Sequence, residues 1–109
     1  MNQVASDTRC DEKSDMDFVS VVIPFYNESG QILMTLETTE RVLRTLDIRF
    51  EILAIDDGSC DSTWDEILKY REKSSHVSAL RFSRNFGKEA AICAGLAKAK
   101  GDAVILMDG

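Results

Sequence analysis

The sequence predicts a Rossmann-like parallel α/β sheet built from four strands and three helices. From Phe18 onward, short apolar runs alternate with longer segments whose apolar residues recur at helical spacing. This alternation of strand and helix is typical of right-handed parallel units within one sheet. The length of 109 residues suits one compact domain, and an apolar content of 44% is sufficient for a packed core.

The four predicted strands are apolar runs of the length expected for strands buried on both faces. They cover residues 19–25, 51–56, 77–82 and 103–107.

Three helices are predicted between these strands. The helix over residues 30–46 is expected to bury residues on one face: Ile32, Leu36, Thr39, Leu43 and Leu46. The second helix begins at Asp61 or Ser62, because both are good N-caps, and is expected to bury Trp64, Ile67 and Leu68. The third, over residues 87–100, places small residues on one face, Ala90, Ala94 and Ala97, and ends at Gly101 as its C-cap.

The composition excludes several classes of protein. Nineteen acidic and thirteen basic residues give a formal charge of -6, which disfavours a nucleic-acid partner because that partner needs a net basic face. Three cysteines, Cys10, Cys60 and Cys93, have neither the number for a disulfide framework nor the spacing of zinc ligands. We therefore expect a reducing compartment.

The first seventeen residues are predicted to form a disordered acidic tail. They carry five acidic and two basic side chains and almost no apolar residues. The pattern of a signal peptide does not occur before Phe18, and no apolar run approaches the roughly 20 residues that cross a bilayer. We therefore expect the chain to begin in the cytoplasm and this part of it not to span a membrane.

Acidic residues gather where the predicted strands end, which is where ligands bind in open parallel sheets. Glu28 follows the first strand, Asp56 and Asp57 end the second, and Asp108 ends the fourth. The turn PFYNESG after the first strand has no G-x-G-x-x-G dinucleotide motif, and a Walker lysine loop is also missing. The carboxylates could accept hydrogen bonds from a base or ribose, as suits Asp57, or hold a divalent cation, as suits Asp108.

Three motifs together resemble the nucleotide-binding half of the family 2 inverting glycosyltransferases. They are VSVVIPFYNE, EILAIDDGSCDST and SRNFGKEAAICAGLAKAKGDAVILMDG, and the resemblance covers residues 18–109. Within that family, RNFGKEAA is similar to the polyprenyl-phosphate glycosyltransferases. The resemblance implies a GT-A fold.

The resemblance also implies roles for six residues. Pro24, Tyr26 and Glu28 occupy nucleotide-contact positions, Asp57 the position that hydrogen-bonds the base or ribose, and Lys88 a basic position near the nucleotide. Asp108 corresponds to the first acid of the D-x-D metal motif. Because the chain ends at Gly109, before the second acid, residues 18–109 are expected to be a truncated N-terminal part of a glycosyltransferase domain.

The implied reaction transfers a sugar from a UDP- or GDP-sugar to a polyprenyl phosphate with inversion, with Mg²⁺ or Mn²⁺ as the cofactor. An acceptor phosphate has a second pKa near 6 and is already anionic at neutral pH, so it needs less help from a general base. The sequence assigns no catalytic base. The full-length protein is expected at the cytoplasmic side of a membrane, held there by its missing C-terminal part, and the fragment alone to be soluble or to aggregate.

Other interpretations stay open. The acceptor could be a polysaccharide or other saccharide in place of the polyprenyl phosphate, or the chain could be a nucleotide-binding fragment without catalysis. A receiver-type domain is disfavoured, because its acid pair would follow the first strand and its acceptor Asp the third, where Ser83 stands. Asp56 is expected to be structural and His76 to lie at the surface, while Arg84 and Asn85 are undecided. For the site residues, the alternatives are a turn or cap for Asp57, packing for Tyr26, and solvated side chains for Glu28 and Lys88.

Overall fold

The computed structural model describes residues 18–107, so the predicted tail and Asp108 lie outside the described residues. The predicted order of four strands and three helices is confirmed, with boundaries that differ by at most two residues. The elements are β2 (Phe18–Phe25), α1 (Ile32–Thr45), β3 (Arg49–Asp56), α2 (Thr63–Lys73), β4 (Val77–Arg81), α3 (Lys88–Lys98) and β5 (Ala103–Leu106).

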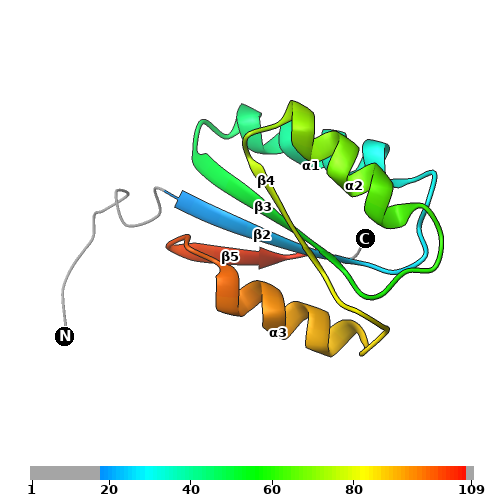
Figure 1. The fold of residues 1–109 in the computed structure, drawn as a ribbon. Coiled ribbons are helices and arrows are strands. Elements are labelled where there is room, and N and C mark those ends of the chain that lie inside the picture. Colours follow the sequence, from blue (N-terminus) through cyan, green and yellow to red (C-terminus); the bar gives the residue numbers. More distant parts are fainter. Residues whose placement is uncertain (1–17, 108–109) are drawn as a thin grey trace, which may run out of the picture.

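The strands form one parallel sheet in the order β4-β3-β2-β5. α1 and α2 cover one face of this sheet, and α3 covers the other (Figure 1). The chain adds strands on one side of β2 and then returns to pair β5 with its other side. The strand order therefore reverses at β2. A ligand is expected to bind beyond the carboxyl ends of β2 and its neighbours.

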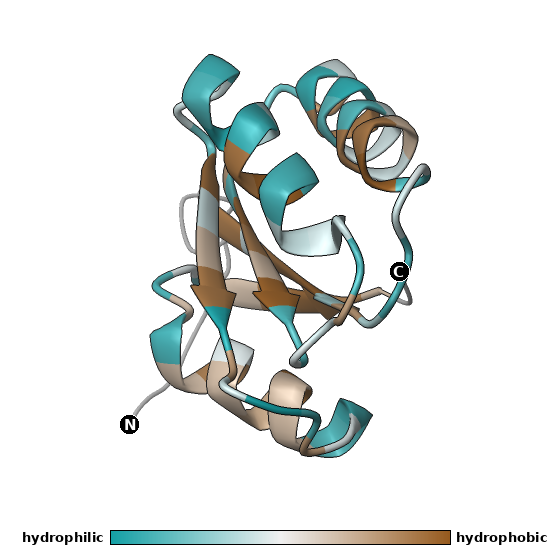
Figure 2. Ribbon diagram, turned by 45° about the vertical axis from the view of Figure 1, so that its right-hand side comes forward, coloured by the Kyte–Doolittle hydropathy of each residue, from teal (hydrophilic) through white to brown (hydrophobic). Residues whose placement is uncertain are grey.

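The apolar core lies on both faces of the central strands, which are the brown interior of the ribbon in Figure 2. Every second residue of β2 packs on the face covered by α1 and α2, namely Val21, Ile23 and Phe25. Val22, between them, packs with Ala91 of α3 on the opposite face. Because parallel strands covered on both faces bury every residue, their near-continuous apolar sequence is explained by this arrangement.

The buried residues of α3 are not the alanines that the sequence places on one face. Ala91 and Gly95 are its buried residues, whereas Ala90 and Ala94 are half-buried and Ala97 is exposed. A methyl group on Gly95 would overlap Val22 Cγ1. The helix therefore packs on the sheet through Gly95, because a glycine at this position permits the closest approach. The small residues that the sequence places on one face, Ala90, Ala94 and Ala97, are therefore not the residues that α3 buries most deeply.

The prediction that Gly101 caps α3 is wrong, because the helix ends at Lys98 and its C-cap is Ala99. Gly101 instead permits a close approach of backbones at the start of β5. A Cβ there would lie 2.7 Å from the backbone nitrogen of Ser20.

The other two helices bury most of the predicted residues. In α1, Ile32, Leu36, Thr39 and Leu43 are buried, but Leu46 is the C-cap and 55% exposed, because the helix ends before it. In α2, Ile67 is buried as predicted, whereas Trp64 and Leu68 are only partly buried. The other buried residues of α2, Thr63 and Tyr70, were not among the predicted ones.

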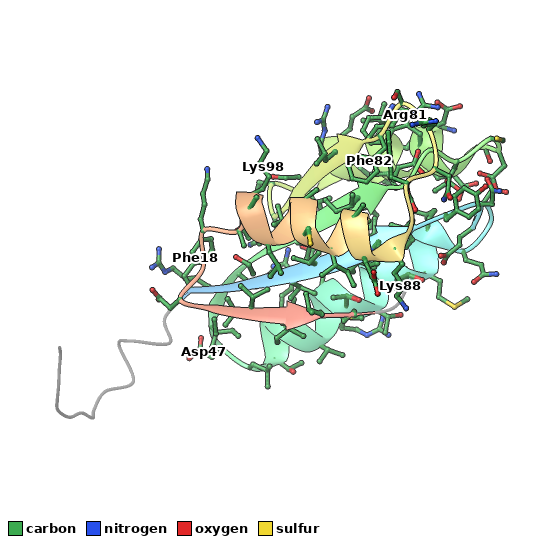
Figure 3. All side chains as sticks on the ribbon, turned by 90° about the horizontal axis from the view of Figure 1, so that it is seen from below. Phe18, Asp47, Arg81, Phe82, Lys88 and Lys98 are labelled. Atoms are coloured by element: carbon green, nitrogen blue, oxygen red, sulfur yellow. The ribbon has the colours of Figure 1, made fainter. Side chains whose placement is uncertain are left out.

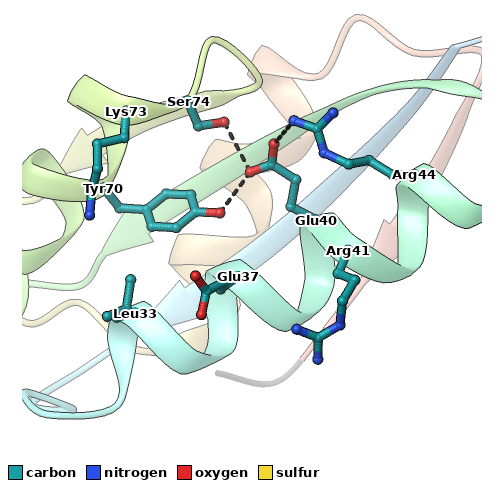
Figure 4. A pocket seen from close by; sticks show the side chains of 8 residues that line it. All are labelled: Leu33, Glu37, Glu40, Arg41, Arg44, Tyr70, Lys73 and Ser74. Carbon is teal, nitrogen blue, oxygen red and sulfur yellow. Dashed lines mark hydrogen bonds and ion pairs between the residues drawn. The ribbon is translucent and has the colours of Figure 1, made fainter.

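A buried carboxylate holds α1 against α2 (Figure 4). Glu40 of α1 is 6% exposed and accepts hydrogen bonds from the Tyr70 hydroxyl (2.7 Å), from Ser74 Oγ (3.0 Å) and from Arg44. Burial raises the pKa of Glu40, but the hydrogen bonds from Tyr70, Arg44 and Ser74 outweigh burial, and the pKa lies below its ordinary value. Burial and the Glu40 carboxylate raise the pKa of Tyr70.

His76 joins the same cluster, although the sequence suggested a surface position. Its Nδ1 lies 3.3 Å from Glu40 Oε2, and its ring stacks on Phe50 with centroids 4.2 Å apart. The hollow beside this cluster, about 430 Å³ in volume, is lined by α1, α2 and Ser74. Because Ser74 leads into the amino end of β4, this hollow does not lie at the ligand-binding edge of the sheet.

Candidate functional site

A cleft of about 560 Å³ opens beyond the carboxyl ends of β2 and β3. All five nucleotide-site residues predicted from the sequence line it: Pro24, Tyr26, Glu28, Asp57 and Lys88. Phe25, Asn85 and Gly87 complete the lining. Three segments that are distant in the sequence therefore meet at the one edge of the sheet where parallel α/β folds bind ligands.

The end of β2 forms one wall of the cleft. Pro24 and Phe25 are buried, and the chain then turns at Asn27, whose φ is 50°. Tyr26 is 45% exposed, so its ring has a large accessible surface beside the cleft. Glu28 is half-buried. This first loop thus offers an aromatic ring and a carboxylate to a ligand.

Asp57 is buried at the base of the cleft, with 3% of its surface exposed. Its Oδ1 accepts a hydrogen bond from Phe86 N (2.8 Å), and its Oδ2 accepts from Asn85 Nδ2 (2.9 Å) and Gly87 N (3.0 Å). These three donors compensate for the burial of a carboxylate. Asp57 therefore ties the end of β3 to the loop before α3. Asn85, undecided from the sequence, is one of its partners.

Two glycines shape these loops, and one of them, Gly58, lies where the loops approach each other closely. Gly58 has a φ of 71°, and a Cβ on it would overlap the backbone of Arg84 and Asn85. Gly87 has a φ of 103° and immediately precedes α3. L-residues rarely adopt either conformation, so both positions favour glycine.

Asp56 has a structural position, as expected from the sequence. Its side chain is fully buried, and Oδ1 accepts hydrogen bonds from Ser59 N (3.1 Å) and Ser59 Oγ (2.5 Å). Its Oδ2 faces Arg81 Nε at 3.6 Å, and the Arg81 guanidinium lies over the Trp64 ring. Asp56 does not belong to the residues that line the cleft.

The first loop is attached to residues 59–66, which comprise the end of the connection from β3 and the first turn of α2. The backbone N–H groups of Asn27, Glu28, Ser29 and Gly30 donate to side chains of that segment: Ser59 Oγ (2.8 Å), Thr63 Oγ1 (2.8 Å), Asp61 Oδ2 (3.1 Å) and Glu66 Oε1 (2.9 Å), in that order. In return, Cys60 N donates to Asn27 Oδ1 at 2.8 Å. The sequence indicates a helix start and one of the three family motifs in this segment, but it does not indicate these contacts with the first loop.

Asp61 also organises the beginning of α2. Its Oδ1 accepts from both the hydroxyl and the backbone nitrogen of Thr63, whereas the N-cap residue Ser62 makes no capping hydrogen bond with its side chain. The hydroxyl of Thr63, followed by the backbone donors of Thr63 and Ser29, lowers the pKa of Asp61 to about 2. The carboxylate is therefore ionised at neutral pH, as suits an acceptor of several hydrogen bonds.

Lys88 is the first residue of α3 and lies at the end of that helix nearest the carboxyl ends of the strands (Figure 3). Lys98 lies at the opposite end, near Phe18. The side chain of Lys88 is exposed at the cleft. Arg84 does not line the cleft, and its guanidinium lies 4.7 Å from the centroid of the half-exposed Phe86 ring.

Within residues 18–107, there is no group of three or more His, Cys, Asp or Glu side chains placed to hold a metal ion. Of the two carboxylates that line the cleft, that of Asp57 is already bound to loop donors. A metal at this site would therefore need further ligands, and the predicted ligand, Asp108, lies outside the described residues. The helices of the described part include none long and apolar enough to cross a membrane.

The strand order and the cleft at its reversal match the nucleotide-binding half of a GT-A fold. The family model for Glycosyl transferase family 2 matches residues 20–109, and the chain belongs to this family. The family resemblance stated from the three sequence motifs is thereby confirmed.

Curated relatives and solved structures extend this result. The chain is 44% identical over 92 residues to the undecaprenyl-phosphate 4-deoxy-4-formamido-L-arabinose transferase of Pseudomonas syringae pv. syringae (strain B728a), a match that covers 84% of this chain and 27% of that protein. S. aureus TarS 1-349 in complex with UDP-GlcNAc is 29% identical with a TM-score of 0.66, over 83% of this chain and 26% of TarS. The matched part of the chain thus spans about a quarter of the length of these relatives.

The mannosyltransferase PcManGT from Pyrobaculum calidifontis, in complex with GDP-Man and Mn²⁺, has a TM-score of 0.71 at 24% identity. The alignment covers 83% of this chain and 26% of PcManGT. At this identity the likeness supports the shared fold.

Proposed function

We propose that residues 18–109 form the nucleotide-sugar-binding part of a glycosyltransferase that transfers a sugar to a polyprenyl phosphate with inversion. The observation that carries the proposal is the cleft that brings Pro24, Tyr26, Glu28, Asp57 and Lys88 together at the carboxyl edge of the sheet. The family membership and the undecaprenyl-phosphate transferases among the relatives support it.

The donor in this proposal is a UDP- or GDP-sugar. Tyr26 offers a ring, Glu28 offers a carboxylate to ribose hydroxyls, and Lys88 offers a positive charge near the phosphates. Asp57 acts at the base or ribose and also fixes the loop that carries Asn85 and Gly87. The complexes of TarS with UDP-GlcNAc and of PcManGT with GDP-Man support a sugar nucleotide as the class of donor.

The cofactor in this proposal is Mg²⁺ or Mn²⁺, held by Asp108 and by a second acid outside this chain. A divalent cation stabilises the charge that develops on the departing diphosphate. The Mn²⁺ in the PcManGT complex supports a divalent metal as the cofactor. Asp108 directly follows the last described residue, Met107, whose backbone nitrogen donates to Val22 O at 3.0 Å.

The acceptor in this proposal is a lipid phosphate at the cytoplasmic side of a membrane, whose oxygen attacks the anomeric carbon of the donor sugar while the nucleoside diphosphate leaves. A phosphate monoester is anionic at neutral pH and is therefore a better nucleophile than a sugar hydroxyl without a strong base. The names of the relatives support this class of acceptor. Attachment to the membrane is assigned to a part of the protein beyond this chain.

A transfer assay with the full-length protein tests the proposal. Labelled UDP- and GDP-sugars are incubated with undecaprenyl phosphate and Mg²⁺ or Mn²⁺, and we expect a labelled lipid product that a chelator abolishes. The variant Asp108→Ala is expected to lose metal-dependent transfer while its metal-free nucleotide affinity stays nearly unchanged. Label transferred only to a saccharide would replace the lipid acceptor, and normal turnover by Asp108→Ala would remove the metal assignment.

A further inference from the structure

Both loops that border the cleft are attached to residues 57–66, which comprise the connection between β3 and α2 and the first turn of α2. On one side, Asp57 binds Asn85, Phe86 and Gly87 of the loop before α3. On the other side, residues 59–66, here called the clamp segment, bind the first loop through their side chains. The shape of the cleft therefore depends on one continuous segment, residues 57–66, of which only Asp57 lines the cleft.

The first loop depends on the clamp segment for four consecutive backbone hydrogen bonds. The N–H groups of Asn27 to Gly30 all donate to side-chain oxygens of that segment. Tyr26 N has only a long contact of 3.4 Å, with Glu28 Oε2 of the same loop. Because these four donors bind side chains rather than a neighbouring strand, substitutions in the clamp segment can release the loop.

Thr63 is the centre of the clamp segment, and its side chain is fully buried. Its hydroxyl accepts a hydrogen bond from Glu28 N at 2.8 Å and donates one to Asp61 Oδ1 at 2.5 Å. The other oxygen of Asp61 accepts from Ser29 N at 3.1 Å. One buried hydroxyl and one carboxylate thus hold two successive residues of the loop, Glu28 and Ser29, two and three positions after Tyr26.

We propose that Thr63, Asp61 and Ser59 are positioning residues that set the affinity for the donor nucleotide. None of the three lines the cleft; they act by holding the backbone that carries Tyr26 and Glu28. The effect on affinity rests on the proposed function, while the attachment of the loop does not. A preorganised loop binds more tightly because its conformational entropy is lost before the ligand arrives.

A pair of variants in the full-length protein tests this proposal. Thr63→Val keeps the shape of the side chain and removes the hydroxyl, whereas Thr63→Ser keeps the hydroxyl. Tyr70→Phe is the control, because Tyr70 lies in the same helix as Thr63 but does not line the cleft. This change also removes a buried hydroxyl, the one that donates to Glu40 of α1. Asp61→Asn is a second, exposed position that weakens the clamp segment if Thr63→Val does not fold.

Two readouts are measured. The first is amide hydrogen exchange of residues 27–30 without ligand, and the second is the Kd for UDP and GDP by calorimetry. We expect Thr63→Val to exchange these amides faster and to bind the preferred nucleotide about tenfold more weakly, as the loss of roughly one hydrogen bond implies. Thr63→Ser and Tyr70→Phe are expected to stay within about twofold of the wild type, well below the factor of ten that one hydrogen bond represents.

The outcomes separate the two claims. Wild-type exchange at residues 27–30 in both Thr63→Val and Asp61→Asn overturns the proposed role of the clamp segment. So does a loss of affinity in Tyr70→Phe that equals that of Thr63→Val, because the effect would then follow general stability. If the wild-type protein binds neither nucleotide, the proposed function fails, and the exchange data still decide whether the clamp segment holds the loop.

Discussion

Asp57 combines a place in the cleft with an anchoring role, and both depend on its carboxylate. It is one of the eight residues that line the cleft, yet it accepts three hydrogen bonds from the opposing loop. From the sequence, a ligand contact and a structural turn were alternative interpretations. The structure shows that a carboxylate at this position reaches both the cleft and the loop before α3.

We predict that Asp57→Ala weakens binding of the nucleotide by the full-length protein, even without metal. Losing a hydrogen bond to a charged group is worth about 1.5 to 3 kcal/mol, and release of the Asn85–Gly87 loop acts in the same direction. Calorimetry with UDP and GDP measures the change, with Glu72→Ala on the exposed side of α2 as the control. Unchanged affinity for the preferred nucleotide would remove Asp57 from the site.

The lining residues could be predicted from the sequence, whereas the residues that hold them could not. Tyr26, Glu28 and Asp57 follow apolar runs that read clearly as strands, and the rule that ligands bind beyond strand ends places them together. Ser59 and Thr63 act on backbone N–H groups of another loop. Such bonds can be made to any residue type except proline, so they leave no complementary pattern at the partner positions.

The packing of α3 on the sheet is set by a single close contact. Gly95 faces Val22 so closely that a methyl group on the helix would overlap the valine side chain. The sequence could predict the helix and its small residues. It could not predict the contact face, because alanines recur on several sides of α3 and the closest approach depends on the side chains of β2.

We predict that Gly95→Ala destabilises the fold by about 1 to 3 kcal/mol, since overpacking a close contact displaces the helix. Because the cause is the overlap with Val22, we expect the double variant Gly95→Ala with Val22→Ala to lose less unfolding free energy than the sum of the two single variants. Denaturant unfolding of the two single variants and the double variant measures the coupling. Strictly additive effects would show that the two residues do not meet as described.

The pair of helices α1 and α2 depends on the ionised form of Glu40. Because its folded pKa lies below the ordinary value of 4.5, the carboxylate stabilises the fold fully above that pH. The stabilisation is lost as the pH falls through the lower folded pKa. We predict that lowering the pH from about 6 to below 4.5 decreases the unfolding free energy of Glu40→Gln less than that of the wild type.

Denaturant unfolding at a series of pH values measures this difference for Glu40→Gln. Glu72→Gln, on the exposed side of α2, is expected to follow the wild type. Parallel curves for the wild type and Glu40→Gln would show that Glu40 does not contribute to the acid sensitivity.

Across the whole sheet, β5 is the outermost strand beside β2 in the described residues. Its residues Val104, Ile105 and Leu106 are 38%, 43% and 51% exposed. The sequence could predict this strand from its apolar residues. It could not show how much of the strand is exposed, because exposure depends on what packs beside it.

We predict that residues 1–109 expressed alone neither stay monomeric nor transfer sugar. The open apolar edge of β5 can pair with other chains, and the acceptor site is assigned to later chain. Light scattering and the transfer assay measure the two properties, and Leu106→Lys is expected to reduce association. A monodisperse, active preparation of residues 1–109 would contradict the prediction.

The strand order also has a consequence for how the chain folds during synthesis. Ser20 of β2 pairs with Glu51 of β3, 31 residues later, whereas the bond from Phe18 N to Asp102 beside β5 spans 84 residues. Contacts between distant residues form more slowly, because closing a longer loop costs more entropy. On the ribosome, β2, β3 and β4 are all made before β5. The strand that leads into the cleft is therefore an inner strand of the sheet formed by residues 18–107, yet it stays open along one side until β5 is synthesised.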